Sequence, residues 1–338
     1  MNSKQNLQHS ISEAEDRQKQ LRDCFFSALS GHYKNNLVDF LYDPLPLAAN
    51  NNIGDFDKIL ACDDQYYVYQ CEVDVINRAL SSIYSYLPSG ITMLEYGPGP
   101  VDSVLNKSGP LINTLNPENY IAFDRCLRYG RDAAALAKKI NPKLESEFLT
   151  IDFFDKSISH KTIDSPLIIS FGGTLFNIDA DSPDEYLDNL STHLYIWRSQ
   201  LPENGYLLIS QDTNNNAAIL LSAYFNAWNE SFIKNILIKM QSDPMQTGLD
   251  SNKWDYVVHW NEKTFQVDMG FVANDNFALS IGSQHVTVNK GQYLHVESSY
   301  KLPEAVFLDA ARKGGFMPVQ TFRQPGNPVV LHLLRVAA

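Results

Sequence analysis

The sequence has few cysteines and no long apolar run, and both shortages limit what the protein can be. Only four cysteines occur in 338 residues, and none of them forms a CxxC pair. This spacing favours reduced thiols over a disulfide framework or a zinc site. Each apolar run is far shorter than the about 20 residues that a membrane-spanning helix needs. The N-terminal segment lacks the apolar stretch of a signal peptide, so we expect a cytoplasmic protein.

Basic residues are also scarce relative to acidic ones. Lys and Arg number 27 and Asp and Glu number 39, which gives a formal net charge of −12. Such a surface repels phosphate backbones and anionic lipid, so we expect no nucleic-acid or membrane partner. The 8 histidines show no HxH or HExxH spacing, so we expect no metal site. The hydrophobic content of 44% excludes wholesale disorder, and the length suits two domains.

The order of apolar runs and helical patterns indicates the fold class. Five short apolar runs predict strands at residues 92–96, 120–123, 147–151, 167–171 and 206–210. Amphipathic spacing predicts helices at residues 10–30, 71–90, 128–140 and 184–199. Strands that alternate with helices predict a parallel sheet covered on both faces, and residues 31–70 look irregular.

The alternation breaks in the last third of the chain. We expect one long helix at 216–240 and then consecutive antiparallel strands over 254–300, with turns at 261–262 and 289–291. The earlier pattern returns with a helix at 303–313 and strands near 317–322 and 329–336. The simplest architecture is a doubly wound domain with an inserted antiparallel section. The site should lie where the two meet, at the carboxyl ends of the parallel strands.

Glycines and acidic residues follow the first three predicted strands. Gly97 and Gly99 let a backbone turn approach an anion, although a plain strand-to-helix turn gives the same pattern. A NAD fingerprint needs a third glycine where Asp102 stands. Asp124 can bind a ribose diol, and Asp152 with Phe153 can bind and cover an adenine. Each aspartate alone can be a helix cap or a turn residue, but the combination indicates an S-adenosylmethionine site.

Two segments further along the chain resemble the histidine-specific methyltransferases. Gly172–Asn177 (GGTLFN) is similar to the G-[ST]-T-[IL]-x-N segment of that family, and Glu297–Lys301 (ESSYK) is similar to its E-x-S-x-K. Upstream, YYVYQCE at 66–72 resembles Y-Y-x-T-R-T-E. The similarity runs from Tyr42 to the C-terminus and includes Asp212, Ala223, Tyr224, Phe232, Asn235, Trp260 and Met269.

The resemblance implies a fold and an activity. The fold is α/β, a Rossmann-like methyltransferase sheet with a second, smaller α+β domain formed by the N-terminus and an insertion. The methyltransferase domain would span 71–212 plus 302–338, and the substrate-binding domain 1–70 plus 213–301. The activity would be S-adenosylmethionine-dependent N-methylation of the α-amine of an amino acid, histidine or a close analogue.

The resemblance also implies the site residues. Tyr66 would lie near the amine, and Asn177 and Tyr224 would hold the carboxylate of the substrate, which makes these three the candidate catalytic residues. Glu297 and Ser299 would hold an imidazole through its two ring nitrogens, since one nitrogen donates and the other accepts. Phe232 and Met269 would be pocket walls. The expected cofactor contacts are Tyr42, Glu95, Gly97, Gly99, Asp124, Asp152, Phe153 and Gly172.

Plainer interpretations stay open for several of these residues. Glu297 can be an exposed strand residue paired with Lys301, Asn177 a loop-capping amide, and Phe232 and Met269 ordinary core residues.

Departures from the family pattern keep other functions open. Pro100-Val101-Asp102 stand where the family has Ser, Thr and Lys, Tyr69-Gln70-Cys71 replace its Thr-Arg-Thr, and Phe225-Asn226 replace an acidic pair. The same chemistry on a tryptophan-like or natural-product amine is therefore the second hypothesis. A cofactor-binding protein without turnover would not need Asn177, Tyr224 and Glu297, and an NAD oxidoreductase is disfavoured by Asp102. The oligomeric state is not predictable from the sequence.

Overall fold

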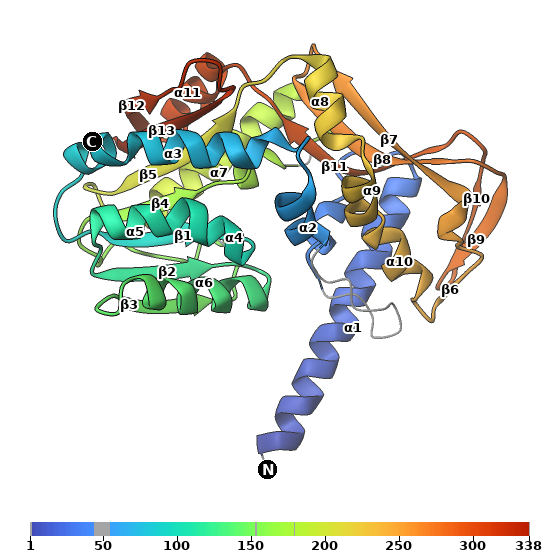
Figure 1. The fold of residues 1–338 in the computed structure, drawn as a ribbon. Helices are drawn as coiled ribbons and strands as arrows, with labels where there is room; N and C mark the ends of the chain where they lie inside the picture. Colours follow the sequence, from blue (N-terminus) through green and yellow to red (C-terminus); the bar gives the residue numbers. More distant parts are fainter. Residues whose placement is uncertain (1, 44–54, 153, 179, 338) are drawn as a thin grey trace.

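A seven-stranded mixed sheet organises the larger part of the molecule (Figure 1). The computed structural model describes residues 2–43, 55–152, 154–178 and 180–337. The strand order is β12-β13-β5-β4-β1-β2-β3, in which β1 to β5 are parallel and β13 is antiparallel to both of its neighbours. The strands are β1 (Thr92–Tyr96), β2 (Asn119–Phe123), β3 (Glu145–Leu149), β4 (Pro166–Ser170), β5 (Tyr206–Asp212), β12 (Phe316–Phe322) and β13 (Val329–Val336).

Helices cover both faces of this sheet, so its central strands are buried throughout. All residues of β1 and β4 are buried, which is typical of parallel strands between two helical layers. Met93 packs on the face covered by α3 (Tyr67–Tyr86), α5 (Gly109–Leu115) and α6 (Leu127–Ile140). Leu94 packs on the opposite face, with α7 (Pro183–Gln200) and α11 (Glu304–Lys313). Between β1 and α5 lie α4 (Val101–Ser103) and a π-helical turn, η2 (Val104–Ser108).

The remaining segments build a second hydrophobic core, to the right of the sheet in Figure 1. Its helical elements are α1 (Asn2–Leu29), η1 (Leu37–Phe40), α2 (Asp55–Cys62), α8 (Ala217–Tyr224), α9 (Ala227–Ile233), α10 (Asn235–Gln241) and η4 (Ser251–Lys253). Among the described residues, its strands form the antiparallel sheets β11-β8-β7 and β10-β9-β6. These strands are β6 (Gln246–Thr247), β7 (Trp254–Asn261), β8 (Gln266–Ala273), β9 (Phe277–Ile281), β10 (Gln284–Val288) and β11 (Tyr293–Tyr300).

The predicted fold class is confirmed, a Rossmann-like α/β sheet with a smaller α+β part formed by the N-terminus and an insertion. The domain boundaries proposed at 70/71, 212/213 and 301/302 stay a prediction. Within the described residues, no helix has the length and apolar character needed to cross a bilayer. The same residues also bring together no group of three or more His, Cys, Asp or Glu that could hold a metal ion.

The prediction of one helix over 216–240 is wrong. The chain forms three short helices there, and Asn226 causes the first break because its side chain accepts hydrogen bonds from the backbone of Trp228 and Asn229. The third strand begins at Glu145, two residues before the predicted start. Within 31–70, which we expected to be irregular, the described residues include α2 and the first turn of α3.

Candidate active site

Two cavities that share part of their walls lie between the carboxyl edge of the sheet and the second core. The outer cavity has a volume of about 500 Å³ and is lined by the loops after β1 to β4 together with residues 34–43 and α2. The inner chamber has a volume of about 40 Å³. It is lined by residues at the carboxyl edge of the sheet and by residues of the second hydrophobic core. Tyr42, Phe56, Tyr66, Glu72, Gly172 and Asn177 line both cavities.

Most of the expected cofactor contacts lie in the wall of the outer cavity. Gly97, Gly99 and Gly172 line it, with φ angles of 73°, 69° and 71° that L side chains rarely adopt. A Cβ atom at Gly97 would also lie 3.1 Å from Oγ1 of Thr174, whereas Gly99 faces open space. Glycine is therefore required where the backbone forms the cavity wall. Tyr42, Asp124 and Asp152 line the same cavity.

The two aspartates of the outer cavity differ in their surroundings. Burial raises the pKa of Asp124 to about 6, although hydrogen bonds from the backbone of Cys126 and Gly99 oppose this effect. The carboxylate of Asp152 accepts a hydrogen bond from the backbone of Phe154 at 2.9 Å and one from Arg125 at 2.6 Å. Arg125 also pairs with Asp39, so it joins the sheet to the N-terminal segment across this cavity.

Phe153 and Glu95 differ from the other expected cofactor contacts. Phe153 lies outside the described residues, but Phe154 lines the outer cavity and stacks on His193 with ring centroids 4.1 Å apart. Glu95 does not reach the cavity. It points to the face of the sheet covered by α3, α5 and α6, where its buried carboxylate accepts hydrogen bonds from Ser108 and Tyr120. The assignment of Glu95 as a cofactor contact is therefore corrected to a structural role.

The inner chamber brings together all seven residues expected to contact the substrate. They come from six segments of the chain and are Tyr66 before α3, Asn177 after η3 (Thr174–Phe176), Tyr224 in α8, Phe232 in α9, Met269 in β8, and Glu297 and Ser299 in β11. Glu297 is only 5% exposed, so the interpretation of an exposed strand residue is wrong for it. The roles of these residues in binding and catalysis stay predictions.

A part-buried amide and a buried carboxylate form a pair in this chamber. Nδ2 of Asn177 donates a hydrogen bond to Oε1 of Glu297 at 2.8 Å. Oδ1 of Asn177 is buried and has no hydrogen-bond partner among the described residues. Because a buried acceptor without a donor is costly, this oxygen is suited to receive an N–H group from a ligand.

The tyrosines at the junction of the cavities are neutral phenols. Burial, reinforced by Tyr224 and Glu72, raises the pKa of Tyr66 well above its ordinary value. Burial and the nearby Glu297 raise the pKa of Tyr42 in the same way. Both side chains can therefore hold a ligand by hydrogen bonds, but neither is ionised at neutral pH.

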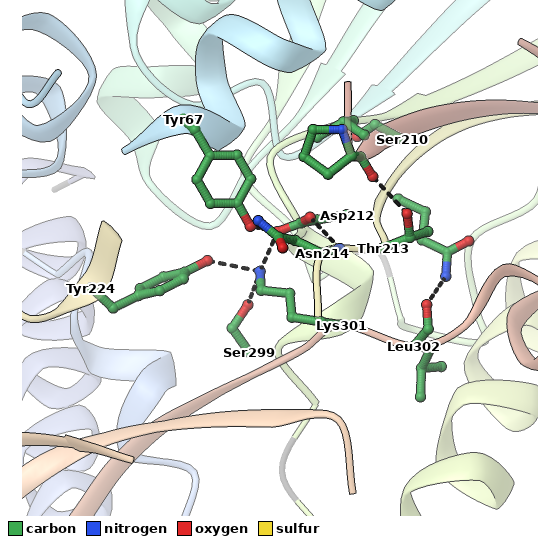
Figure 2. Close-up of polar contacts among 12 residues, drawn as sticks. Tyr67, Ser210, Asp212, Thr213, Asn214, Tyr224, Ser299, Lys301 and Leu302 are labelled. Atoms are coloured by element: carbon green, nitrogen blue, oxygen red, sulfur yellow. Dashed lines mark hydrogen bonds and ion pairs between the residues drawn. The ribbon is translucent and has the colours of Figure 1, made fainter. Parts of the chain in front are cut away.

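A buried lysine lies between two hydroxyl groups in the wall of the chamber (Figure 2). The ammonium group of Lys301 donates to Oη of Tyr224 at 2.7 Å and to Oγ of Ser299 at 3.0 Å, and it pairs with Asp212 at 3.1 Å. Burial alone would lower the pKa of Lys301, but Tyr224 and Asp212 raise it above its ordinary value. Tyr67 donates a further hydrogen bond to Asp212 at 2.6 Å.

Sequence reasoning gave no site role to two charged residues of the cavity walls. Glu72, which is 2% exposed, accepts hydrogen bonds from the backbone of Gly172 at 2.7 Å and from Lys107 at 3.1 Å, so it fixes the loop after β4. Lys107 lies in η2 and lines the outer cavity, whereas Pro100, Val101 and Asp102 do not. The available signals were the glutamate that ends the YYVYQCE segment and a lysine in the helical segment that follows Gly99.

Comparison with known proteins connects this site to a family. The chain matches the family model described as histidine-specific methyltransferase, SAM-dependent, over residues 26–336. It is 25% identical over 251 residues to the uncharacterized protein y4iF of Sinorhizobium fredii (strain NBRC 101917 / NGR234). The matched region covers 73% of this chain and 81% of that protein.

Solved structures of similar fold include two prokaryotic proteins. The PH0226 protein from Pyrococcus horikoshii OT3 is 16% identical, with a TM-score of 0.46 over 83% of this chain and 96% of that one. An S-adenosylmethionine-dependent methyltransferase from Clostridium acetobutylicum ATCC 824 is 13% identical, with a TM-score of 0.45 over 84% and 96%. Both likenesses concern the fold alone. Because the family model spans most of the chain, the protein belongs to the histidine-specific methyltransferase family and is an S-adenosylmethionine-dependent methyltransferase.

Proposed function

We propose that this enzyme methylates the α-amine of an amino acid, histidine or a close analogue. The observation that carries the proposal is the inner chamber, where the Asn177–Glu297 pair lies together with the hydroxyls of Tyr224 and Ser299. A carboxylate and a hydroxyl can hold the two nitrogens of an imidazole, and a phenol can donate to a carboxylate. An apolar side-chain pocket would need none of these groups.

The outer cavity suits S-adenosylmethionine. Gly97 and Gly99 allow a close approach of the backbone, Asp124 can accept two hydrogen bonds from a ribose, and Phe154 offers an aromatic face. Lys107 supplies a cation in the same wall for a ligand carboxylate. When bound, S-adenosylmethionine supplies an electrophilic methyl group on a sulfonium sulfur.

The residues of this chain would act by positioning. We expect the side chain and the carboxylate of the substrate in the inner chamber and its amine at the junction of the cavities. Asn177 would bind the amine rather than the carboxylate, because its Nδ2 already donates to Glu297 and its Oδ1 can only accept. Neutral Tyr66 would orient the amine. Alignment of this kind can supply up to about 7–11 kcal/mol of the barrier reduction. The proton of the ammonium group has to leave first, to a carboxylate or to water.

The departures from the family pattern lie away from the inner chamber, which favours histidine over a tryptophan-like or natural-product amine. Phe225 is 59% exposed, and the side chain of Asn226 caps α9 and donates to Asp63. Gln70 is exposed on α3, and Tyr69 lines only the outer cavity. None of these side chains lines the inner chamber.

Calorimetric titration combined with single-turnover assays tests the proposal. Histidine, tryptophan and their Nα-methylated forms are titrated with and without S-adenosylhomocysteine, and methyl transfer is then followed between pH 6 and 9. We expect histidine to bind best and the rate to rise with pH, because only the free amine reacts. Turnover of tryptophan alone would favour the second hypothesis. A rate that does not change with pH would contradict methylation of an amine.

A further inference from the structure

Asp212 and Lys301 mark the two places where the chain crosses between the sheet and the inserted section. Asp212 is the last residue of β5, from which the chain leaves towards α8, and Lys301 follows β11, from which it returns to α11. Their charged groups pair at 3.1 Å, and both side chains are almost fully buried. A hydrogen bond of 2.8 Å from Gln211 to the carbonyl of Leu302 joins the same two crossings.

All three hydrogens of the Lys301 ammonium group have an acceptor. The three acceptors are Asp212, Tyr224 and Ser299 (Figure 2). An ammonium group has no lone pair and can only donate. The oxygens of Tyr224 and Ser299 therefore accept from Lys301, and the hydrogen of each hydroxyl has to point elsewhere. Both side chains line the inner chamber, which is where a ligand would meet these hydrogens.

The charge of Lys301 is held in place by its surroundings. The carboxylate of Asp212 faces three donors, which are Lys301, the hydroxyl of Tyr67 at 2.6 Å and the backbone N–H of Asn214 at 3.0 Å. An ion pair of this kind keeps a buried ammonium group protonated. It thereby keeps the direction of its three hydrogen bonds fixed.

We propose that Lys301 is a positioning residue that turns Tyr224 and Ser299 into hydrogen-bond donors towards the substrate. Lys301 lines the inner chamber but has no hydrogen left to donate to the substrate, because all three are used within the protein. This inference rests on the proposed function and adds to it the reason for selectivity at the carboxylate end. Tyr224 would donate its hydrogen to the carboxylate of the amino acid. Ser299 would donate its hydrogen to the ring nitrogen of the imidazole that carries no hydrogen.

The test compares two substrates that differ in the carboxylate. Values of kcat/KM are measured at saturating S-adenosylmethionine for histidine and for histamine, which lacks the carboxylate. We expect the wild type to prefer histidine. Lys301→Met should lose about tenfold or more of this preference, because the freed hydroxyl of Tyr224 can rotate towards the unpaired Asp212.

Three further variants separate positioning from a purely structural role. Lys239→Met removes another buried lysine, whose ammonium group donates to the backbone of Phe40 and Leu41, and should leave the preference unchanged. Asp212→Asn combined with Lys301→Met avoids an unpaired buried charge and should show the same loss if the single variant does not fold. In a Tyr224→Phe, Ser299→Ala background, Lys301→Met should change the preference less than about threefold, because the hydroxyls through which it acts are gone.

The outcomes distinguish this inference from the proposed function. A folded Lys301→Met that loses the same factor on both substrates overturns the inference, since Lys301 would then only stabilise the protein, and leaves the proposed function intact. A wild type that turns over histidine without preference over histamine also overturns the inference. A wild type that methylates no α-amino acid overturns the proposed function, and this inference with it.

Discussion

Replacement of Glu297 by alanine should change the choice of amino acid more than the chemistry of methyl transfer. Glu297 is 5% exposed and accepts a hydrogen bond from Asn177 at 2.8 Å. Without Glu297, a bound imidazole would keep an unpaired N–H group in a buried chamber, at a cost of about 1–3 kcal/mol. Since about 1.4 kcal/mol corresponds to a factor of ten, the preference for histidine should fall by about 5- to 150-fold. The loss of the Asn177 contact affects every substrate and cancels in this ratio.

Competition between histidine and phenylalanine measures this preference directly. Equal concentrations of the two are supplied to the wild type and to Glu297→Ala, and the methylated products are quantified by mass spectrometry. Glu297→Gln keeps the length and one acceptor oxygen of the side chain and should lose less of the preference. A melting curve shows that each variant is folded. If folded Glu297→Ala keeps the wild-type ratio within about threefold, Glu297 does not bind an imidazole and the histidine assignment fails.

Two further predictions concern protons at the cofactor and the amine. Burial raises the pKa of Asp124 to about 6, and acceptance of ribose hydroxyls should lower it again, so affinity is lost as the pH falls through about 6. By calorimetry, S-adenosylhomocysteine should bind the wild type about tenfold more weakly at pH 5 than at pH 7; an equal loss in Asp124→Asn would contradict this. Burial also keeps Tyr66 protonated, so Tyr66→Phe should slow single-turnover methylation about 2- to 10-fold without changing its rise between pH 6 and 9. Disappearance of that rise in Tyr66→Phe would identify Tyr66 as the proton acceptor instead.

Local patterns were enough to predict the sheet, but they failed where a capping residue interrupts an apolar sequence. The strands β1 and β4 are short, fully buried runs, and the turns and helices between them have clear signals. The apolar spacing over 216–240 continues past Asn226, yet that residue ends one helix and caps the next. β3 alternates between exposed and half-buried residues at the edge of the sheet, so its start was misjudged.

The candidate site was predictable where topology alone brings residues together. The carboxyl ends of parallel strands share one edge, and this places Gly97, Gly99 and Asp124 in one cavity wall. Glu95 was misassigned because a strand buried on both faces gives no sign of which way each side chain points. Two buried ion pairs join residues that are far apart in the sequence, Lys107 with Glu72 and Lys301 with Asp212. No local sequence pattern indicates such pairs.

A single irregularity in β11 decides which of its side chains reach the chamber. In a regular strand His295 and Glu297 would share a face, since side chains alternate with a period of two. The pairing of β11 with β8 shifts between these residues, and the extra residue turns His295 to the face of Ser298, whose Oγ lies 2.7 Å from its Nε2. Glu297 and Ser299 are then left together on the chamber face. If Leu294 kept its place, a strand without this bulge would turn Val296 and Ser298 to the chamber face in place of Glu297 and Ser299. The orientation of the segment at 297–301 therefore depends on the bulge before it, although the motif itself contains no sign of one.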